Sequence, residues 1–275
     1  MTRVGFIGLG DQGGPMARRI AEEAHPLTIW ARRSATTGSF ADTSATVASS
    51  PAELGAASDV VGVCVVADAD VEDVLMRPDG VLAGMAPGGI VAVHSTIRPE
   101  TCLRLADEAA ARGIALVDAP VSGGGDAAAR GELLVMVGGE EEDVARCRPV
   151  FDAFADPVVH LGLVGSGQRA KLLNNLVFTS QVAVAFETFS LADGLGMDRT
   201  AVAQVLAHGS GGSRAAAILA ASGFDTTGLR RALPLLRKDV GIMVDVAWAD
   251  GGAKPVVLAE LAEITLSTLE KLPGT

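Results

Sequence analysis

The chain has 275 residues, of which 49% are hydrophobic and 20% charged, and its formal net charge is -11 at pH 7. Such a large apolar fraction allows an extensive core, which excludes a disordered chain and favours two structural units. The negative charge opposes broad contact with nucleic acid or an anionic membrane surface, because both require a basic binding surface.

The cysteines and the apolar stretches favour a soluble, cytoplasmic protein. Cys64, Cys102 and Cys147 are widely spaced and show neither a CxxC pair nor Cys/His metal spacing, so we expect reduced thiols and no metal site. The apolar run at residues 3–7 is too short for a signal peptide. Residues 172–191 are the most apolar long stretch, but they include two asparagines, a glutamine and a glutamate, which would be costly in lipid. We therefore interpret this stretch as a buried helix.

The pattern along the chain predicts an α/β fold. From residue 4 to about residue 160, short β-branched runs alternate with alanine-rich stretches, which is typical of repeated βα units in a parallel sheet. After Gly165 and Gly167, helical periodicity dominates. We expect a Rossmann-type, doubly wound, mostly parallel sheet over residues 1–162 and an all-helical domain over residues 163–275. The predicted strands are 4–7, 27–30, 60–66, 89–94, 114–118, 133–137 and 158–160.

A GxGxxG motif lies directly after the first predicted strand and before a helical pattern. Gly8 permits a tight turn, Gly10 allows the backbone to approach a pyrophosphate, and Gly13 allows the helix to pack closely on the strand. The helix N-terminus then faces the phosphates. The motif predicts a dinucleotide site, in which a carboxylate at Asp11 is repulsive unless it points to solvent. The full motif is Gly8, Leu9, Gly10, Asp11, Gln12 and Gly13.

The end of the second predicted strand favours NADP over NAD. After Trp30 and Ala31 come Arg32 and Arg33, with no Asp or Glu that would bind a free 2′-hydroxyl. The two arginines can pair with a 2′-phosphate, whereas the alternative is that they only solvate a loop.

A carboxylate-binding loop is predicted after the strand that ends at Asp118. The segment is Asp118-Ala119-Pro120-Val121-Ser122-Gly123-Gly124, and parallel sheets bind ligands at this end of their strands. The Ser122 hydroxyl and the backbone N–H groups of Gly123 and Gly124 are suited to holding a carboxylate.

The second half contributes candidate catalytic groups. Lys171 and Asn175 are four residues apart on the first long helix, so they share one face. Asn174 is either a further substrate contact or an asparagine that binds the backbone near a helix N-terminus. A second lysine, Lys238, is expected on a later helix.

Taken together, these motifs resemble those of the β-hydroxyacid dehydrogenase family, which includes 3-hydroxyisobutyrate dehydrogenases and tartronate semialdehyde reductases. The resemblance runs from Val4 to about residue 250, and the motifs occur in the family's order. They are Gly8-Leu9-Gly10-x-x-Gly13-x-Pro15-Met16-Ala17, Ser95-Thr96, the segment Asp118 to Gly124, the segment Lys171 to Asn175, and Lys238-Asp239.

The resemblance implies roles for individual residues. Lys171 resembles the family's catalytic lysine, and Asn175 its substrate-orienting neighbour. Thr96 and Lys238 correspond to positions against the cofactor near the nicotinamide, and Ser122, Gly123 and Gly124 to the carboxylate-binding loop. The chain departs from the family at Asp11-Gln12, where an apolar residue and methionine are usual, and at Val65-Val66, where Leu-Pro is usual; both pairs are expected at the cofactor rim.

The implied activity is hydride transfer between NADP(H) and a small 3-hydroxy acid or its semialdehyde. Reduction creates an alkoxide, so Lys171 would supply both a counter-charge and a proton, with desolvation lowering its pKa. One alternative is an imine or ketone reductase on the same scaffold, a group that generally lacks the lysine. Another is a non-catalytic dinucleotide-binding scaffold protein, which has no need of Lys171 or the carboxylate loop. The apolar helix also predicts a homo-oligomer formed through the helical domain.

Overall fold

The computed structural model describes residues 1–23, 25–249, 251 and 254–272. It divides into two compact units, Met1–Lys171 and Leu172–Thr275, and the division falls within helix α8 (Ser166–Gly194). The sequence placed the boundary at residue 162, ahead of this helix, and residues 273–275 of the predicted helical domain lie outside the described residues.

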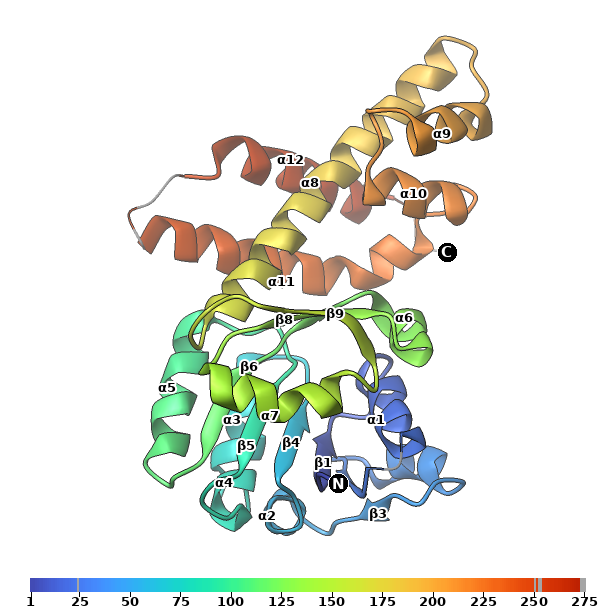
Figure 1. Cartoon of the computed structure of the whole chain (residues 1–275). Helices are drawn as coiled ribbons and strands as arrows, with labels where there is room; N and C mark the ends of the chain where they lie inside the picture. Colours follow the sequence, from blue (N-terminus) through green and yellow to red (C-terminus); the bar gives the residue numbers. More distant parts are fainter. Residues whose placement is uncertain (24, 250, 252–253, 273–275) are drawn as a thin grey trace. The chain divides into compact units, whose positions relative to one another are not determined.

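The first unit is built on a six-stranded parallel sheet, which confirms the predicted Rossmann-type architecture (Figure 1). The predicted strand 60–66 ends at Val63: Cys64 N still donates to Ile7 O (2.8 Å), but Val65 N donates to the Ser95 hydroxyl (2.8 Å) instead of to a neighbouring strand. The short strand β3 was not predicted. The sheet order is β3 (Thr46–Val47), β2 (Leu27–Trp30), β1 (Val4–Ile7), β4 (Val60–Val63), β5 (Ile90–Val93) and β6 (Ala115–Asp118).

Helices cover both faces of this sheet, as the unbroken apolar strands predicted. Successive strand residues alternate between two buried clusters, with Phe6 in one and Ile7 in the other. One face packs against α1 (Gly13–Glu22), α6 (Gly124–Arg130) and α7 (Glu141–Phe151). The other packs against α2 (Pro51–Ala56), α3 (Asp68–Met76), α4 (Val81–Gly84) and α5 (Pro99–Ala110), and a 3-10 helix, η1 (Ser34–Phe40), follows β2.

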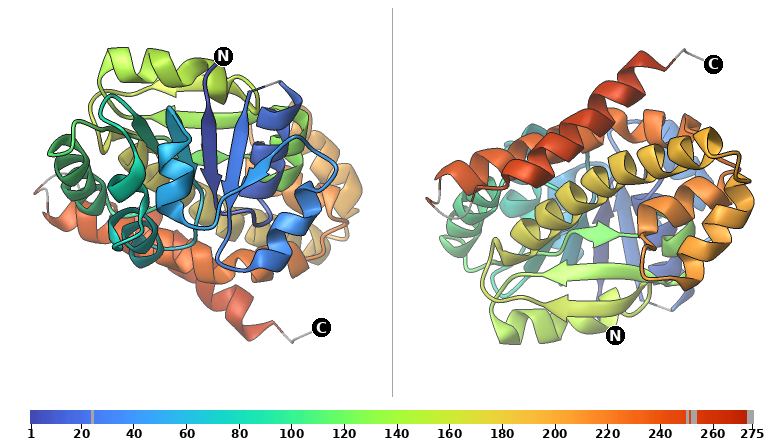
Figure 2. Two further views of the ribbon diagram at one scale, coloured as in Figure 1. Left: turned by 90° about the horizontal axis from the view of Figure 1, so that it is seen from below. Right: turned by 90° about the horizontal axis from the view of Figure 1, so that it is seen from above.

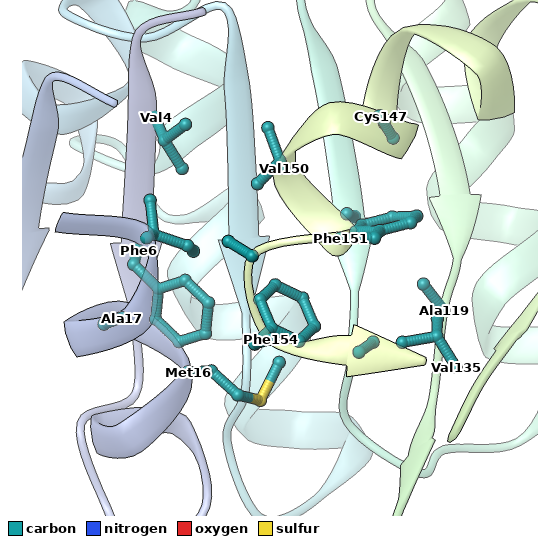
Figure 3. Close-up of a cluster of buried hydrophobic side chains, with 14 of the residues drawn as sticks. Val4, Phe6, Met16, Ala17, Ala119, Val135, Cys147, Val150, Phe151 and Phe154 are labelled. Carbon is teal, nitrogen blue, oxygen red and sulfur yellow. The ribbon is translucent and has the colours of Figure 1, made fainter. Parts of the chain in front are cut away.

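An aromatic cluster fills the first of these two faces (Figure 3). His94 stacks on Phe6 with ring centroids 6.0 Å apart and makes edge contacts with Phe151 and Phe154. Its Nδ1 lies 2.8 Å from the Ala119 carbonyl oxygen, and burial lowers the pKa of His94 to about 4. His94 is therefore a neutral core residue at neutral pH.

Three strands that follow β6 form a separate sheet. In it, β7 (Val121–Ser122) pairs antiparallel with β8 (Leu133–Val137), and β8 pairs parallel with β9 (Ala155–His160). The sequence placed 133–137 and 158–160 in one mostly parallel sheet and did not predict β7. Pro120 explains the break, because proline has no N–H to continue the β6 ladder, and its carbonyl instead accepts from Met136 N (3.0 Å).

The second unit is helical, as predicted. It consists of the part of α8 that follows Lys171 and of four further helices, which Figure 2 shows in two views. These helices are α9 (Arg199–His208), α10 (Arg214–Ala221), α11 (Thr227–Ala249) and α12 (Val256–Lys271). Leu176 of α8 packs with Leu236 of α11 and Leu266 of α12. Pro234 lies inside α11, which begins at Thr227.

Among the described residues, no helix has the length and apolar character needed to cross a membrane. Within the same part of the chain, no group of three or more His, Cys, Asp or Glu side chains gathers where a metal ion could bind. All three cysteines are free thiols.

Large apolar side chains remain exposed on the helical unit, including Leu191 (62%), Leu195 (67%) and Val205 (68%). Because exposed apolar surface of this kind is costly in water, we predict a homo-oligomer formed through this unit. Light scattering at micromolar concentration should give at least twice the monomer mass, and Leu195→Asp should lower it. Leu103→Asp, an exposed apolar position of the first unit, is the matched control and should leave the mass unchanged. A monomeric wild-type protein would contradict the prediction.

Candidate functional site

A cavity opens in the first unit at the carboxyl ends of β1, β2 and β4. This is the edge at which parallel α/β sheets bind ligands. It brings together seven predicted cofactor residues: Gly8, Leu9, Gly10, Arg32, Arg33, Val65 and Val66. The remaining lining residues were not predicted: Ile7, Trp30, Ala31, Thr36, Cys64, Asp70, Asp73 and Val74.

The three glycines of the GxGxxG motif serve two different purposes. A Cβ at Gly8, where φ is +96°, would lie 2.0 Å from the Cys64 carbonyl oxygen, and a Cβ at Gly13 would lie 1.9 Å from the Gly8 carbonyl oxygen. Gly8 and Gly13 are therefore required by the packing of the chain itself. A Cβ at Gly10 meets no atom within 4 Å, so its missing side chain leaves space for a group outside the protein.

The rest of the motif forms the start of α1. Gln12 is the N-cap residue, and its side chain makes no capping hydrogen bond. No acidic residue lies in the first turn, so the positive end of the helix dipole faces no carboxylate of its own. These features fit the binding of a dinucleotide phosphate. Asp11 is exposed, as a carboxylate next to a phosphate site must be if it is not to repel the phosphate.

The arginines at the end of β2 have an acidic neighbour that the sequence did not predict. Arg32 Nη1 lies 3.3 Å from Asp70 Oδ1 at the start of α3, although the Arg32 side chain is 75% exposed. Arg33 and Thr36 line the same cavity. Cys64 also lines it, and burial raises the pKa of its thiol to about 12, so this thiol is protonated at neutral pH.

The loops after β4 and β5 are joined by Ser95. Its hydroxyl oxygen accepts a hydrogen bond from Val65 N (2.8 Å), which ties the first loop to the second. Val66 is 63% exposed at the cavity rim. Thr96 follows Ser95 at the carboxyl end of β5 but is outside the cavity lining.

The predicted carboxylate-binding loop connects the second sheet to α6. Ser122 is the last residue of β7, Gly123 precedes α6, and Gly124 begins it. Gly123 has φ +136° and Gly124 has φ +77°, conformations that L side chains rarely adopt. A Cβ at Gly125 would lie 2.3 Å from the Asp11 carbonyl oxygen, so this loop and the GxGxxG motif are in close contact.

Asp118, whose carboxylate is fully buried, accepts hydrogen bonds from the backbone at the start of α8. Its Oδ1 accepts from Gly165 N (2.7 Å) and its Oδ2 accepts from Gln168 N (2.6 Å). Burial raises the pKa of Asp118 to about 6, although the backbone N–H groups oppose that rise. In the sequence, Asp118 belongs to a family motif but has no predicted role; its only signal is that a carboxylate ends an apolar strand.

Gln168, also fully buried, joins α8 to the loop after β5. Its Nε2 donates to the Ser95 carbonyl oxygen (2.8 Å), and its Oε1 accepts from Ile97 N (3.1 Å), so it holds both neighbours of Thr96. Lys171 follows three residues later in α8 and is buried. Gln168 was not predicted as a site residue, because one glutamine at a helix start has no distinctive spacing in the sequence.

In the helical unit, a polar network surrounds another buried carboxylate, that of Asp239. Asn175 Nδ2 donates to Asp239 Oδ2 (2.7 Å), and Lys238 Nζ lies 3.3 Å from Asp239 Oδ1. Asn174 is exposed, and its Nδ2 donates to Asn175 Oδ1 (3.2 Å). The structure thus links three predicted residues through Asp239, which the sequence had noted only beside Lys238.

Comparisons with known proteins match both parts of the chain. Residues 3–162 match the family model of the NAD binding domain of 6-phosphogluconate dehydrogenase. Residues 165–274 match the model described as NAD-binding of NADP-dependent 3-hydroxyisobutyrate dehydrogenase.

Individual relatives agree with these matches. An NAD-dependent L-serine dehydrogenase of Pseudomonas aeruginosa is 32% identical, with 93% of this chain and 89% of that protein covered. A 3-hydroxyisobutyrate dehydrogenase of the same species is 35% identical over 78% of this chain and 72% of that one. Among solved structures, Mycobacterium tuberculosis 3-hydroxyisobutyrate dehydrogenase with L-serine has a TM-score of 0.87 and 28% identity, covering 98% of this chain and 94% of that chain.

The fold, the glycine turn and these matches define an NAD(P)-dependent oxidoreductase. The chain belongs to the β-hydroxyacid dehydrogenase family, as its motifs predicted.

The different purposes of the glycines generate a prediction. Gly10→Ala should leave the melting temperature nearly unchanged, because its Cβ meets no protein atom, but weaken dinucleotide binding by about tenfold or more, roughly 1.4 kcal/mol. Titration of NADPH fluorescence measures the binding. Gly38→Ala, equally open but outside the cavity lining, is the control and should bind as the wild type does, whereas Gly8→Ala should lower the melting temperature. Unchanged affinity in Gly10→Ala would rule out close approach of the cofactor at this residue.

Proposed function

We propose that the protein transfers a hydride between NADP(H) and a small 3-hydroxy acid or its semialdehyde, with Lys171 as the general acid and base. The observation that carries the proposal is the buried lysine, one turn into α8, whose first turn is hydrogen-bonded to the carboxyl ends of β5 and β6. The substrate class is supported by the relatives, which are named as dehydrogenases of L-serine and of 3-hydroxyisobutyrate. Both of these compounds have a carboxylate and a hydroxyl on the β-carbon.

The chemistry assigned to Lys171 follows from its residue type. NAD(P)H, when bound, supplies the hydride, and its oxidised form accepts one. As negative charge develops on the carbonyl oxygen of the substrate, the Lys171 ammonium stabilises that oxygen and donates a proton to it. In the oxidation direction, the neutral amine of Lys171 takes the hydroxyl proton. The burial of Lys171 strengthens the attraction between its ammonium and the developing negative charge, since less water screens the two charges.

The substrate carboxylate is assigned to the loop of Ser122, Gly123 and Gly124. The positive φ of both glycines supports this assignment, because turns of this kind can direct successive backbone N–H groups at an anion. Asn175 is assigned to orienting the substrate, because α8 is continuous from Lys171 and four residues bring both side chains to one helix face. Asn174, which bonds Asn175, is a further candidate contact.

NADP is the proposed cofactor, with Arg32 and Arg33 pairing with its 2′-phosphate. Both arginines line the cavity. The matches to known proteins do not choose between the cofactors, because they include NAD-dependent and NADP-dependent enzymes. Backbone groups of the glycine turn hold the pyrophosphate, and Thr96 and Lys238 are assigned positions near the nicotinamide. A cytoplasmic location also remains a prediction from the cysteine pattern.

The cofactor assignment predicts that Arg32→Ala/Arg33→Ala weakens NADPH far more than NADH, by about tenfold or more, because only NADPH has a phosphate to lose. Dissociation constants of both cofactors measure this. Arg104→Ala, an exposed arginine of α5, should change neither. Equal losses for the two cofactors, or a wild-type preference for NADH, would show that the arginines do not bind a 2′-phosphate.

The catalytic assignment predicts that Lys171→Ala lowers kcat by about a hundredfold or more, because the developing alkoxide loses its counter-charge and its proton source. The dissociation constant of NADPH should barely change. Steady-state kinetics with short 3-hydroxy acids and their semialdehydes provides the measurement, and Lys271→Ala, an exposed lysine of α12, should behave as the wild type. Near-normal turnover of Lys171→Ala would refute the mechanism and favour the imine-reductase or scaffold alternative.

A further inference from the structure

The first turn of α8 is fixed by more than ordinary helix packing. Asp118 lies at the end of β6 and is fully buried, yet both of its carboxylate oxygens accept hydrogen bonds from backbone N–H groups of residues 165–168. An unbonded carboxylate at this depth would be strongly destabilising, because nothing would replace its lost hydration. The bonds therefore hold the start of α8 at one place relative to the sheet.

Two glycines make room for this carboxylate. A Cβ at Gly138 would lie 2.3 Å from Asp118 Oδ1, and a Cβ at Gly167 would lie 2.9 Å from Asp118 Oδ2. The Gly138 position is itself fixed, because its backbone N–H and C=O both pair with Asp118 (2.8 and 3.0 Å). The space between Gly138 and Gly167 therefore fits the Asp118 carboxylate closely.

Gln168 extends the same turn to the other strands. Its amide binds on both sides of Thr96, and the hydroxyl of Ser95 in turn accepts from Val65 N. One side chain therefore couples the start of α8 to the loops after β4 and β5. Lys171 lies one turn beyond these bonds on the same helix.

We propose that Asp118 and Gln168 are positioning residues that set the place of Lys171 relative to the loops at the carboxyl ends of β4, β5 and β6. This inference rests on the proposed role of Lys171. Its physical basis is that proton transfer requires close alignment, so that a displacement of about 1 Å can cost about a hundredfold in rate. Neither side chain needs to contact substrate or cofactor.

The key experiment is a double-mutant cycle with the full-length protein. Asp118→Asn keeps the shape but replaces one acceptor oxygen by an NH₂ group, which opposes a backbone donor. We expect kcat to fall by about 10- to 100-fold while the NADPH dissociation constant changes less than about threefold. In the Lys171→Ala background the same change should lower the residual kcat by less than about twofold, because no lysine remains to be misplaced.

Two further variants separate positioning from general stability. Gln168→Met removes both amide bonds at similar volume and should reproduce the non-additive loss, so it tests the proposal even if Asp118→Asn does not fold. Ser58→Ala removes a buried side-chain bond, Ser58 Oγ to Leu54 O, just before β4 begins. It should lower the melting temperature without changing kcat.

Equal fold losses of kcat in the wild-type and Lys171→Ala backgrounds, or no loss with either positioning variant, would overturn the inference. If Lys171→Ala alone retains wild-type kcat, the proposed function fails instead, so the two failures are distinguishable. Non-additive losses from both Asp118→Asn and Gln168→Met would establish the positioning role.

Discussion

The buried carboxylate of Asp118 is the interaction on which the arrangement of the first unit's ligand-binding edge depends. A charge removed from water is tolerated only when hydrogen bonds replace its hydration, and here the donors are the backbone N–H groups at the start of α8. The requirement works in both directions, because those N–H groups also need acceptors at a helix end. One interaction therefore satisfies a strand end and a helix start together.

The cofactor cavity depends on main-chain geometry more than on particular side chains. Gly8 and Gly13 are required by contacts within the chain, and the loop after β4 is held through the backbone N–H of Val65. A bond made by the backbone does not change when the side chain changes. A Val-Val pair and the Leu-Pro pair that is usual in the family both keep the backbone N–H of residue 65, which makes this bond.

Charge at the cavity is more balanced than the local sequence indicates. The end of β2 has two arginines and no acid, yet α3 brings Asp70 to Arg32 and places Asp73 in the same lining. A phosphate bound by Arg32 would compete with the carboxylate of Asp70, while Arg33 has no ion-pair partner among those identified in the described residues. If the arginines bind a 2′-phosphate as proposed, discrimination between the two nicotinamide cofactors would depend on the acidic residues of α3 as well as on the end of β2.

The sequence by itself determined the features that arise over short distances along the chain. The glycine turn, the unbroken apolar strands and the helical second half follow from local sterics and periodicity, and the family motifs reinforced them. Only the tertiary structure decided which distant groups meet. Asp118 pairs with residues 47 and 50 positions away, Asn175 bonds Asp239 64 positions away, and the chain enters a separate sheet after Pro120. No local pattern specifies such partners, because a buried polar group accepts any donor that the packing brings within reach.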